Sequence, residues 1–220
     1  RGYYKIQQAT IRDIAISNQG RSVLYGRSDG VVVFLNLETG RRIEFLGHQD
    51  KVNTVDLSPN GRYALSGSND YVAYFWDTRT GQVIHRFNHP TRVTQVTLDP
   101  QGRYAFTADS MKQAHVWKLT TGDLVSKLAY IARQKIFTAV RFNDEGNLIA
   151  TGSPNRLVDL WQLESGKKLQ TWQVIPREGS RPKSAVVLDV AFTDNNQALL
   201  TESSSGFAES FNLRESNEYN

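Results

Sequence analysis

His48, Ser66 and Asp70 are the residue types of a hydrolytic triad, in which a histidine takes the proton of a nucleophilic serine and an aspartate orients the histidine. The same three types also form buried hydrogen-bonded networks that only support a fold, because each can satisfy the polar groups of the next. Trp76 follows the trio and favours this second role, since a buried indole N–H needs an acceptor. The place of these residues in the organisation of the chain decides between catalysis and structure.

Other sites of chemistry have little support in the sequence. The chain contains no cysteine, which excludes disulfides, thiolate nucleophiles and cysteine-ligated zinc. His85 and His89 have a spacing that places two metal ligands on one face only in a helix, whereas this segment has the pattern of a strand that runs into a loop. No HExxH, GxSxG or phosphate-cradling glycine motif occurs. We therefore expect no catalytic residues, no metal and no cofactor.

The charge and hydropathy of the chain limit its partners. Its 26 Lys and Arg residues stand against 22 Asp and Glu residues, a formal net charge of +4, and the basic residues are dispersed. This excess is too weak to predict a nucleic-acid partner. No apolar run approaches the roughly 18 residues of a membrane-spanning helix, and no signal peptide opens the chain. Because Arg1 is not an initiator methionine, we expect a missing upstream segment.

A repeat organises the whole chain. Turn residues recur at intervals of 41, 41, 44 and 50 residues: Gly20, Gly61, Gly102, Gly146 and Asn196. Large apolar residues recur at the same intervals: Leu35, Trp76, Trp117, Trp161 and Phe211. Thr-Gly or Ser-Gly pairs form a third series: Thr39-Gly40, Thr80-Gly81, Thr121-Gly122 and Ser165-Gly166. Three markers with one set of offsets define five repeat units.

Each unit has the pattern of four short strands. In the second unit, Val55–Leu57 alternates apolar and polar residues as a half-buried strand does, and Pro59 and Gly61 form a turn after it. Further strands are expected at 63–66, 72–76 and 83–87, the last with the charge of an outer edge strand. No window has a sustained helical period. The sequence predicts an all-β protein built by radial repetition.

The second unit resembles a WD40 repeat nearly completely. The residues that carry the resemblance are Gly47-His48, Val55–Gly61, Ser66–Asp70 and Trp76-Asp77. The shared offsets extend the resemblance over essentially the whole chain, although the other units have weaker signatures. The resemblance implies a WD40-type β-propeller made of four-stranded antiparallel blades, with about five blades in this chain.

The resemblance also implies a structural role for the trio. WD40 repeats contain a hydrogen-bonded network of His, Ser or Thr, Asp and Trp within one blade, and the matching residues of this chain are His48, Ser66, Asp70 and Trp76. The third unit keeps part of the set, namely His89, Thr107 and Trp117, with Met111 at the position of Asp70. A set that recurs in degraded form is typical of structural support, so we expect that the chain is not an enzyme.

The repeat offsets divide a single propeller domain, residues 1–220. An outer strand of a preceding blade is expected at 1–8 and a tail at 214–220. The units between them are expected at 9–46, 47–87, 88–128, 129–173 and 174–213, the last of them incomplete. Because seven blades are usual in the family, we expect the C-terminal part of a seven-bladed parent, and the alternative is a closed five-bladed ring.

Function in propellers depends on loops grafted onto a rigid scaffold. The resemblance places the loop that enters each unit and the turn between its second and third strands on one face. By repeat offset and by an insertion at 175–183, this candidate face carries Arg12, Lys51, Asn53, Asn69, Arg92, Thr94, Arg177, Arg181 and Lys183. We expect it to bind a protein partner through acidic segments, since arginine is enriched at interfaces. A solvated surface is the open alternative.

The expected function is therefore a non-catalytic scaffold for protein–protein interaction. The alternative is a propeller enzyme or a small-ligand-binding propeller that uses the central channel. The inner strands offer mostly valine and isoleucine to that channel, which favours the scaffold.

A second resemblance concerns origin. The repeated Gly-Arg-Tyr-Ala phrases at 61–64 and 102–105 and the absence of cysteine are similar to bacterial WD40-repeat proteins, some of which are gammaproteobacterial lipoproteins. This resemblance implies a periplasmic or membrane-anchored protein, tethered through a lipidated cysteine of the missing N-terminus. Without that tether, a cytoplasmic protein is expected.

Overall fold

The computed structural model describes residues 9–111, 113–129, 136–179, 185–193 and 196–213. In this part of the chain it contains nineteen β-strands and one short 3₁₀ turn, η1 (Asn18–Gly20). The prediction of an all-β protein is confirmed. The outer strand expected at 1–8 and the tail at 214–220 lie outside the described residues.

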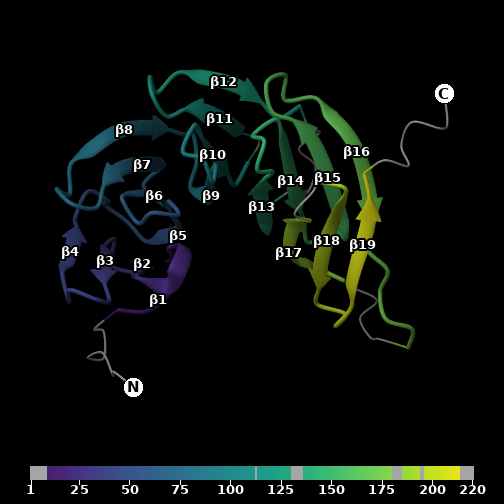
Figure 1. Ribbon diagram of the computed structural model, residues 1–220, viewed down its shortest axis with the longest axis horizontal. Coiled ribbons are helices and arrows are strands. Elements are labelled where there is room, and N and C mark those ends of the chain that lie inside the picture. Colours follow the sequence, from purple (N-terminus) through teal and green to yellow (C-terminus); the bar gives the residue numbers. More distant parts are fainter. Residues whose placement is uncertain (1–8, 112, 130–135, 180–184, 194–195, 214–220) are drawn as a thin grey trace. The chain divides into compact units, whose positions relative to one another are not determined.

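The strands form five antiparallel sheets, each built from strands consecutive in the chain (Figure 1). The first sheet contains β1 (Ile11–Ile16), β2 (Ser22–Arg27), β3 (Val32–Asn36) and β4 (Arg42–Phe45). The second contains β5 (Val52–Leu57), β6 (Tyr63–Ser68), β7 (Val72–Asp77) and β8 (Val83–Asn88). The third contains β9 (Val93–Leu98), β10 (Tyr104–Asp109), β11 (Ala114–Lys118) and β12 (Leu124–Lys127).

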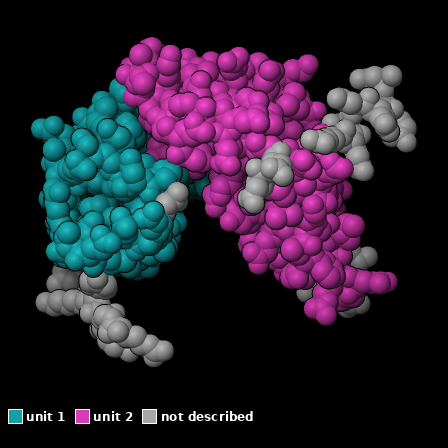
Figure 2. All heavy atoms as spheres, in the orientation of Figure 1, with its two compact units in different colours: residues 1–96 teal, residues 97–220 magenta. Residues whose placement is uncertain are grey.

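The remaining strands make two further sheets. The fourth sheet contains β13 (Ala139–Phe142), β14 (Leu148–Gly152), β15 (Leu157–Gln162) and β16 (Lys168–Gln173). The fifth contains β17 (Val187–Phe192), β18 (Ala198–Ser203) and β19 (Ala208–Asn212), so it has three strands among the described residues. Five antiparallel sheets in chain order confirm the prediction of five strand-built units. The chain divides into two compact units, residues 1–96 and 97–220, with the boundary inside β9 (Figure 2).

The burial of the strands follows their place within a sheet. In the second sheet, the middle strands β6 and β7 are buried almost throughout, whereas the edge strand β8 exposes most of its side chains. Small or apolar residues at nearly every position of a middle strand are typical of a strand covered on both faces. Each middle strand therefore lies between two layers of side chains.

Apolar side chains fill the space between consecutive sheets. In the first compact unit, Leu24 and Phe34 of the first sheet pack against Val52, Val55 and Trp76 of the second sheet. In the second compact unit, one core lies between the third and fourth sheets and contains Phe106, Phe137, Ile149 and Trp161. Another lies between the fourth and fifth sheets and contains Ala150, Val158, Val187 and Val190. Trp76 and Trp161 of the recurring series are thus core residues, whereas Trp117 is half-buried.

The turn series is also visible in the backbone. Gly61 adopts a φ of +69°, a left-handed conformation that glycine accepts without strain. Asn196, which stands at the same place in the fifth repeat, has a φ of +50°. Asparagine tolerates this region better than most residues, so the asparagine can replace the turn glycine.

Candidate functional site

The trio from the sequence forms one hydrogen-bonded network in the second sheet. His48 precedes β5, Ser66 lies in β6, and Asp70 lies in the turn between β6 and β7. His48 Nδ1 donates to Asp70 Oδ2 at 2.9 Å. A carboxylate only accepts, so Nε2 of a neutral imidazole is left to accept from the Ser66 hydroxyl, which lies 2.9 Å away.

Trp76 is held in this network by ring packing. Its indole N–H has no hydrogen-bond acceptor among the described residues. The ring stacks on Phe45 with centroids 4.8 Å apart and planes 8° from parallel, and Phe45 also meets His48 edge-on. The hydrogen-bonded network of the second sheet therefore has three members, and the fourth expected residue joins it through aromatic contact.

The corresponding tryptophans of the next two sheets do make the expected bond. Trp117 Nε1 donates to Thr107 Oγ1 at 2.7 Å, and Trp161 Nε1 donates to Thr151 Oγ1 at 2.9 Å. Of the partial set in the third unit, His89 is buried in the first compact unit. Met111, at the position of Asp70, is exposed.

Several donors converge on the Asp70 carboxylate. Besides His48, the N–H of Gln49 donates to Oδ2 at 2.9 Å and the N–H of Val72 donates to Oδ1 at 3.1 Å. Burial by itself raises the pKa of Asp70, but the hydrogen bonds from His48 and the Gln49 N–H outweigh it and lower the pKa below its usual value. The carboxylate is therefore the charged anchor of this turn.

The burial of the trio is unsuited to nucleophilic catalysis. Ser66 has no exposed surface, and His48 is 6% exposed. A nucleophile must reach a substrate carbon, and this hydroxyl instead bonds a histidine that is itself covered. The described residues also contain no group of three or more His, Asp and Glu side chains that could hold a metal ion.

The residues of the candidate face differ in how much of their surface is exposed. Lys51 and Arg92, which stand just before β5 and β9, and Arg12 of β1 are exposed. Asn53 and Asn69 are half-buried, and Asn53 Nδ2 donates both to Asn69 Oδ1 and to the carbonyl oxygen of Val93 at 2.8 Å. These two amides thus tie β5 to the β6–β7 turn and to β9.

The other described members of the candidate face also differ in exposure. Thr94 of β9 is half-buried. Arg177, between β16 and β17, is exposed. Arg181 and Lys183 lie outside the described residues.

A set of arginine–carboxylate pairs is a feature that the sequence analysis did not assign. The arginine after each of the first three turn glycines pairs with an acid of its own sheet: Arg21 with Glu38 at 3.1 Å, Arg62 with Asp77 at 2.8 Å, and Arg103 with Asp99 at 2.7 Å. The Gly-Arg dipeptides of the repeat were the signal for these pairs. Asp77 and Asp99 are buried while their arginine partners are partly exposed, so these two pairs support the turns at the edge of the fold.

The hydrogen bond and charge of Asp77 favour the charged form of Arg62. The side-chain hydrogen bond to Asp77 raises the pKa of the Arg62 guanidinium above its usual value. Burial by itself raises the pKa of Asp77, but hydrogen bonds from the Arg79 N–H and from Arg62 lower it overall. Asp77 is the aspartate of the Trp-Asp dipeptide, which gives that signature residue a role in fixing the turn.

Comparison with known proteins agrees with this geometry. Residues 40–77 match the family model described as WD domain, G-beta repeat. The match runs from the end of the first sheet through β7 and includes the whole trio. No curated protein matches the chain. Among the described residues, no helix has the length and hydrophobicity needed to cross a membrane. Residues 40–77 of the chain thus match a WD40 repeat, and the five antiparallel sheets are consistent with a WD40-type β-propeller.

Proposed function

We propose that the chain is a non-catalytic scaffold. It binds acidic segments of a partner protein through those residues of the candidate face that belong to the first compact unit, residues 1–96. WD40 repeats are in general sites of protein interaction and in general not catalytic. The observation that carries the proposal is the placement of Lys51 and Arg92. They occupy the same position in consecutive repeats, both are exposed, and neither side chain forms an ion pair with another described residue.

The backbone beneath these cations is well supported. The carbonyl oxygen of Lys51 accepts from the N–H of Asn69 at 2.9 Å. Asn53 holds the carbonyl oxygen of Val93, the residue that follows Arg92. Cations presented from a fixed backbone lose less conformational entropy on binding than cations on a free loop, so more of the electrostatic attraction appears as affinity.

Charge reversal tests this proposal. The probe is a fluorescein-labelled peptide that alternates glutamate with serine, and fluorescence anisotropy of the full chain measures its affinity. The double variant Lys51→Glu, Arg92→Glu is expected to weaken binding about tenfold or more, because two attractive contacts become repulsive. Raised ionic strength is expected to weaken the wild-type complex as well.

The matched control is Arg79→Glu. Arg79 is also exposed and basic and lies in the same compact unit, but it is in the turn between β7 and β8, at the opposite end of the strands. It is expected to leave the affinity unchanged. Equal losses in the control and in the double variant would show a diffuse charge effect and reject the candidate face. A separate variant, Arg177→Glu, tests the insertion at 175–183, which lies in the second compact unit.

A further inference from the structure

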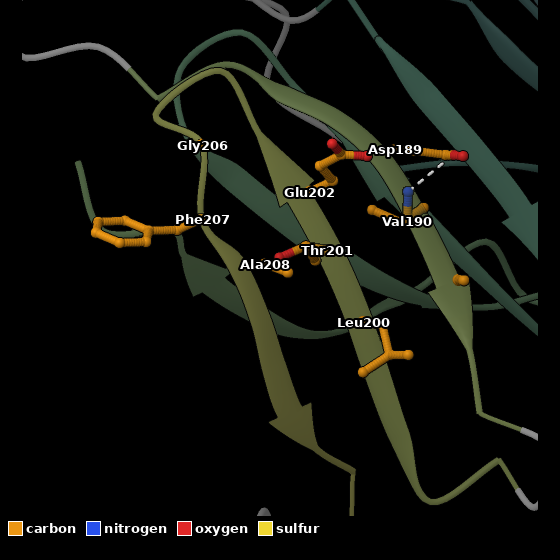
Figure 3. Close-up of a pocket in the computed structure, with 9 residues that line it drawn as sticks. Asp189, Val190, Leu200, Thr201, Glu202, Gly206, Phe207 and Ala208 are labelled. Carbon is orange, nitrogen blue, oxygen red and sulfur yellow. Dashed lines mark hydrogen bonds between the residues drawn. The ribbon is translucent and has the colours of Figure 1, made fainter. Parts of the chain in front are cut away.

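Tyr71 has an unusual backbone conformation in the turn between β6 and β7. Its φ is +71°, in the left-handed region, where a bulky side chain is crowded by its own backbone. The same repeat position is Gly30 in the first sheet and Gly206 in the fifth, with φ of +87° and +78°. Figure 3 shows Gly206 in the turn between β18 and β19. The turn therefore requires a left-handed residue, and glycine would supply it without strain.

The side chain of Tyr71 does not offset this strain inside the fold. It is 53% exposed. It makes no hydrogen bond, ion pair or ring contact with another described residue. Arg156 has a similar φ of +70° in the fourth sheet but is half-buried. Strained residues that surrounding structure holds in place are concentrated at binding sites, which makes Tyr71 a candidate for contact with a partner.

Hydrogen bonds hold the backbone on both sides of Tyr71. The N–H of Asp70 donates to Ser68 Oγ at 3.1 Å, and Asp70 Oδ1 accepts the N–H of Val72 at 3.1 Å. The carbonyl oxygen of Tyr71 accepts the N–H of His89 at 2.8 Å. Because these bonds define the turn, the left-handed conformation is imposed on whatever residue stands at position 71. The tyrosine side chain is therefore presented from a fixed backbone.

The turn of Tyr71 is joined to the loops that carry the two exposed cations of the proposed function. The N–H of Asn69 donates to the carbonyl oxygen of Lys51 at 2.9 Å. His89, which donates to the Tyr71 carbonyl oxygen, lies three residues before Arg92. Tyrosine and arginine are enriched among the residues that carry most of the affinity at protein interfaces. The exposed ring thus belongs to the same part of the first compact unit as the cations.

We propose that Tyr71 anchors a large aliphatic side chain, such as leucine, within the acidic segment that binds Lys51 and Arg92. This role of Tyr71 rests on the proposed function and adds the residue type that the partner must place between its acids. The carboxylates meet the two cations, and the aliphatic side chain covers the exposed face of the ring. The tyrosine hydroxyl at the ring edge can stay in water, so its burial costs nothing.

Two fluorescein-labelled peptides test this role with the full chain. One is Glu-Ser-Glu-Ser-Glu-Ser-Glu, and the other has leucine at the central position. Fluorescence anisotropy is expected to show about tenfold tighter binding of the leucine peptide, the gain from removing much of one leucine side chain from water. Tyr71→Gly is expected to abolish this preference and to leave the affinity for the serine peptide unchanged. Tyr71→Phe keeps the ring and is expected to keep the preference.

The stability of Tyr71→Gly separates a binding role from a structural one. Glycine adopts the left-handed turn without strain, and this gain opposes the greater freedom of glycine in the unfolded chain. The midpoint of thermal unfolding is therefore expected not to fall. A clear fall would show that Tyr71 supports the turn through its packing, and would count against the proposal.

The matched control is Ile84→Thr, which removes another exposed apolar side chain of the second sheet. Ile84 is 42% exposed and lies in the edge strand β8. Its neighbour Val83 pairs with Trp76, whereas the turn of Tyr71 precedes Val72 at the other end of β7. Ile84→Thr is expected to leave the affinities for both peptides unchanged.

The outcomes distinguish the role of Tyr71 from the proposed function. Equal affinity for the two peptides, with a loss of both in Lys51→Glu, Arg92→Glu, would overturn the role of Tyr71 and support the site for acidic segments. A leucine preference that persists in Tyr71→Gly, or that Ile84→Thr abolishes as well, would also overturn it. Binding of neither peptide to the wild-type chain would reject both proposals.

Discussion

Gly67 and Val93 lie so close that a β-carbon on Gly67 would be 2.5 Å from Val93 Cγ1. Gly67 belongs to β6 and Val93 to the part of β9 that lies in the first compact unit, so this contact fixes how closely these two strand segments approach each other. Gly67→Ala is expected to destabilise the chain by about 1–3 kcal/mol, the usual cost of overpacking a close-packed core. Urea unfolding followed by tryptophan fluorescence measures this free energy.

A double-mutant cycle shows whether the contact is the cause. Val93→Ala removes the nearest methyl group that Gly67→Ala would strike, while Val96 Cγ1, at 2.9 Å from the new β-carbon, remains, so the alanine at 67 should cost less in that background than in the wild type. The same cost in both backgrounds would mean that the loss does not come from the contact with Val93 but from the other close neighbours, Val96 and Thr54, or from the backbone of Gly67.

The hydrogen bond between Trp161 and Thr151 provides a second prediction. Trp161 is fully buried, and its indole N–H donates to Thr151 Oγ1 at 2.9 Å. Thr151→Val keeps the side-chain shape but leaves the indole N–H without an acceptor, which is expected to cost about 1–3 kcal/mol. Thermal and urea unfolding measure the change.

The matched background for this variant is Trp161→Phe. Phenylalanine has no N–H to satisfy, so Thr151→Val should be nearly neutral when it is added to Trp161→Phe. A full loss of stability in that background would show that Thr151 acts through another contact.

The repeat offsets predicted much of this fold and part of the site. The strands of the second unit were expected at 63–66, 72–76 and 83–87 and are observed at 63–68, 72–77 and 83–88. The offsets also aligned Asn196 with the turn glycines, and its φ of +50° agrees with that alignment. The repeat spacing predicts strands and turns well because each repeat places the same residue types at its turns and in its core.

Features that depend on the exact approach of side chains were not predictable in this way. Trp76 and Trp161 occupy the same repeat position, yet only Trp161 has an acceptor for its N–H. A serine lies at 66 and a threonine at 151, and the Ser66 hydroxyl bonds His48 whereas the Thr151 hydroxyl accepts from the indole, a difference that the sequence alone does not give.

The pH dependence of stability provides the last prediction, and it concerns Asp70. In the folded chain, hydrogen bonds from His48 and from the N–H groups of Gln49 and Val72 hold the pKa of Asp70 below its usual value. In the unfolded chain an aspartate titrates near its ordinary value of about 3.9, so the unfolded state binds the proton first as the pH falls. The stabilisation is therefore complete above about pH 5 and is lost as the pH falls through the lower pKa of the folded state.

Asp70→Asn isolates this contribution from that of the other carboxylates. Asparagine can still accept a hydrogen bond but carries no charge, so at neutral pH the variant is expected to be less stable by about 1–3 kcal/mol. The difference from the wild type should shrink as the pH falls from about 5 to about 3, because protonation makes wild-type Asp70 neutral as well. Urea unfolding of both proteins across this range measures the difference. A constant difference would mean that Asp70 acts through its shape and not through its charge.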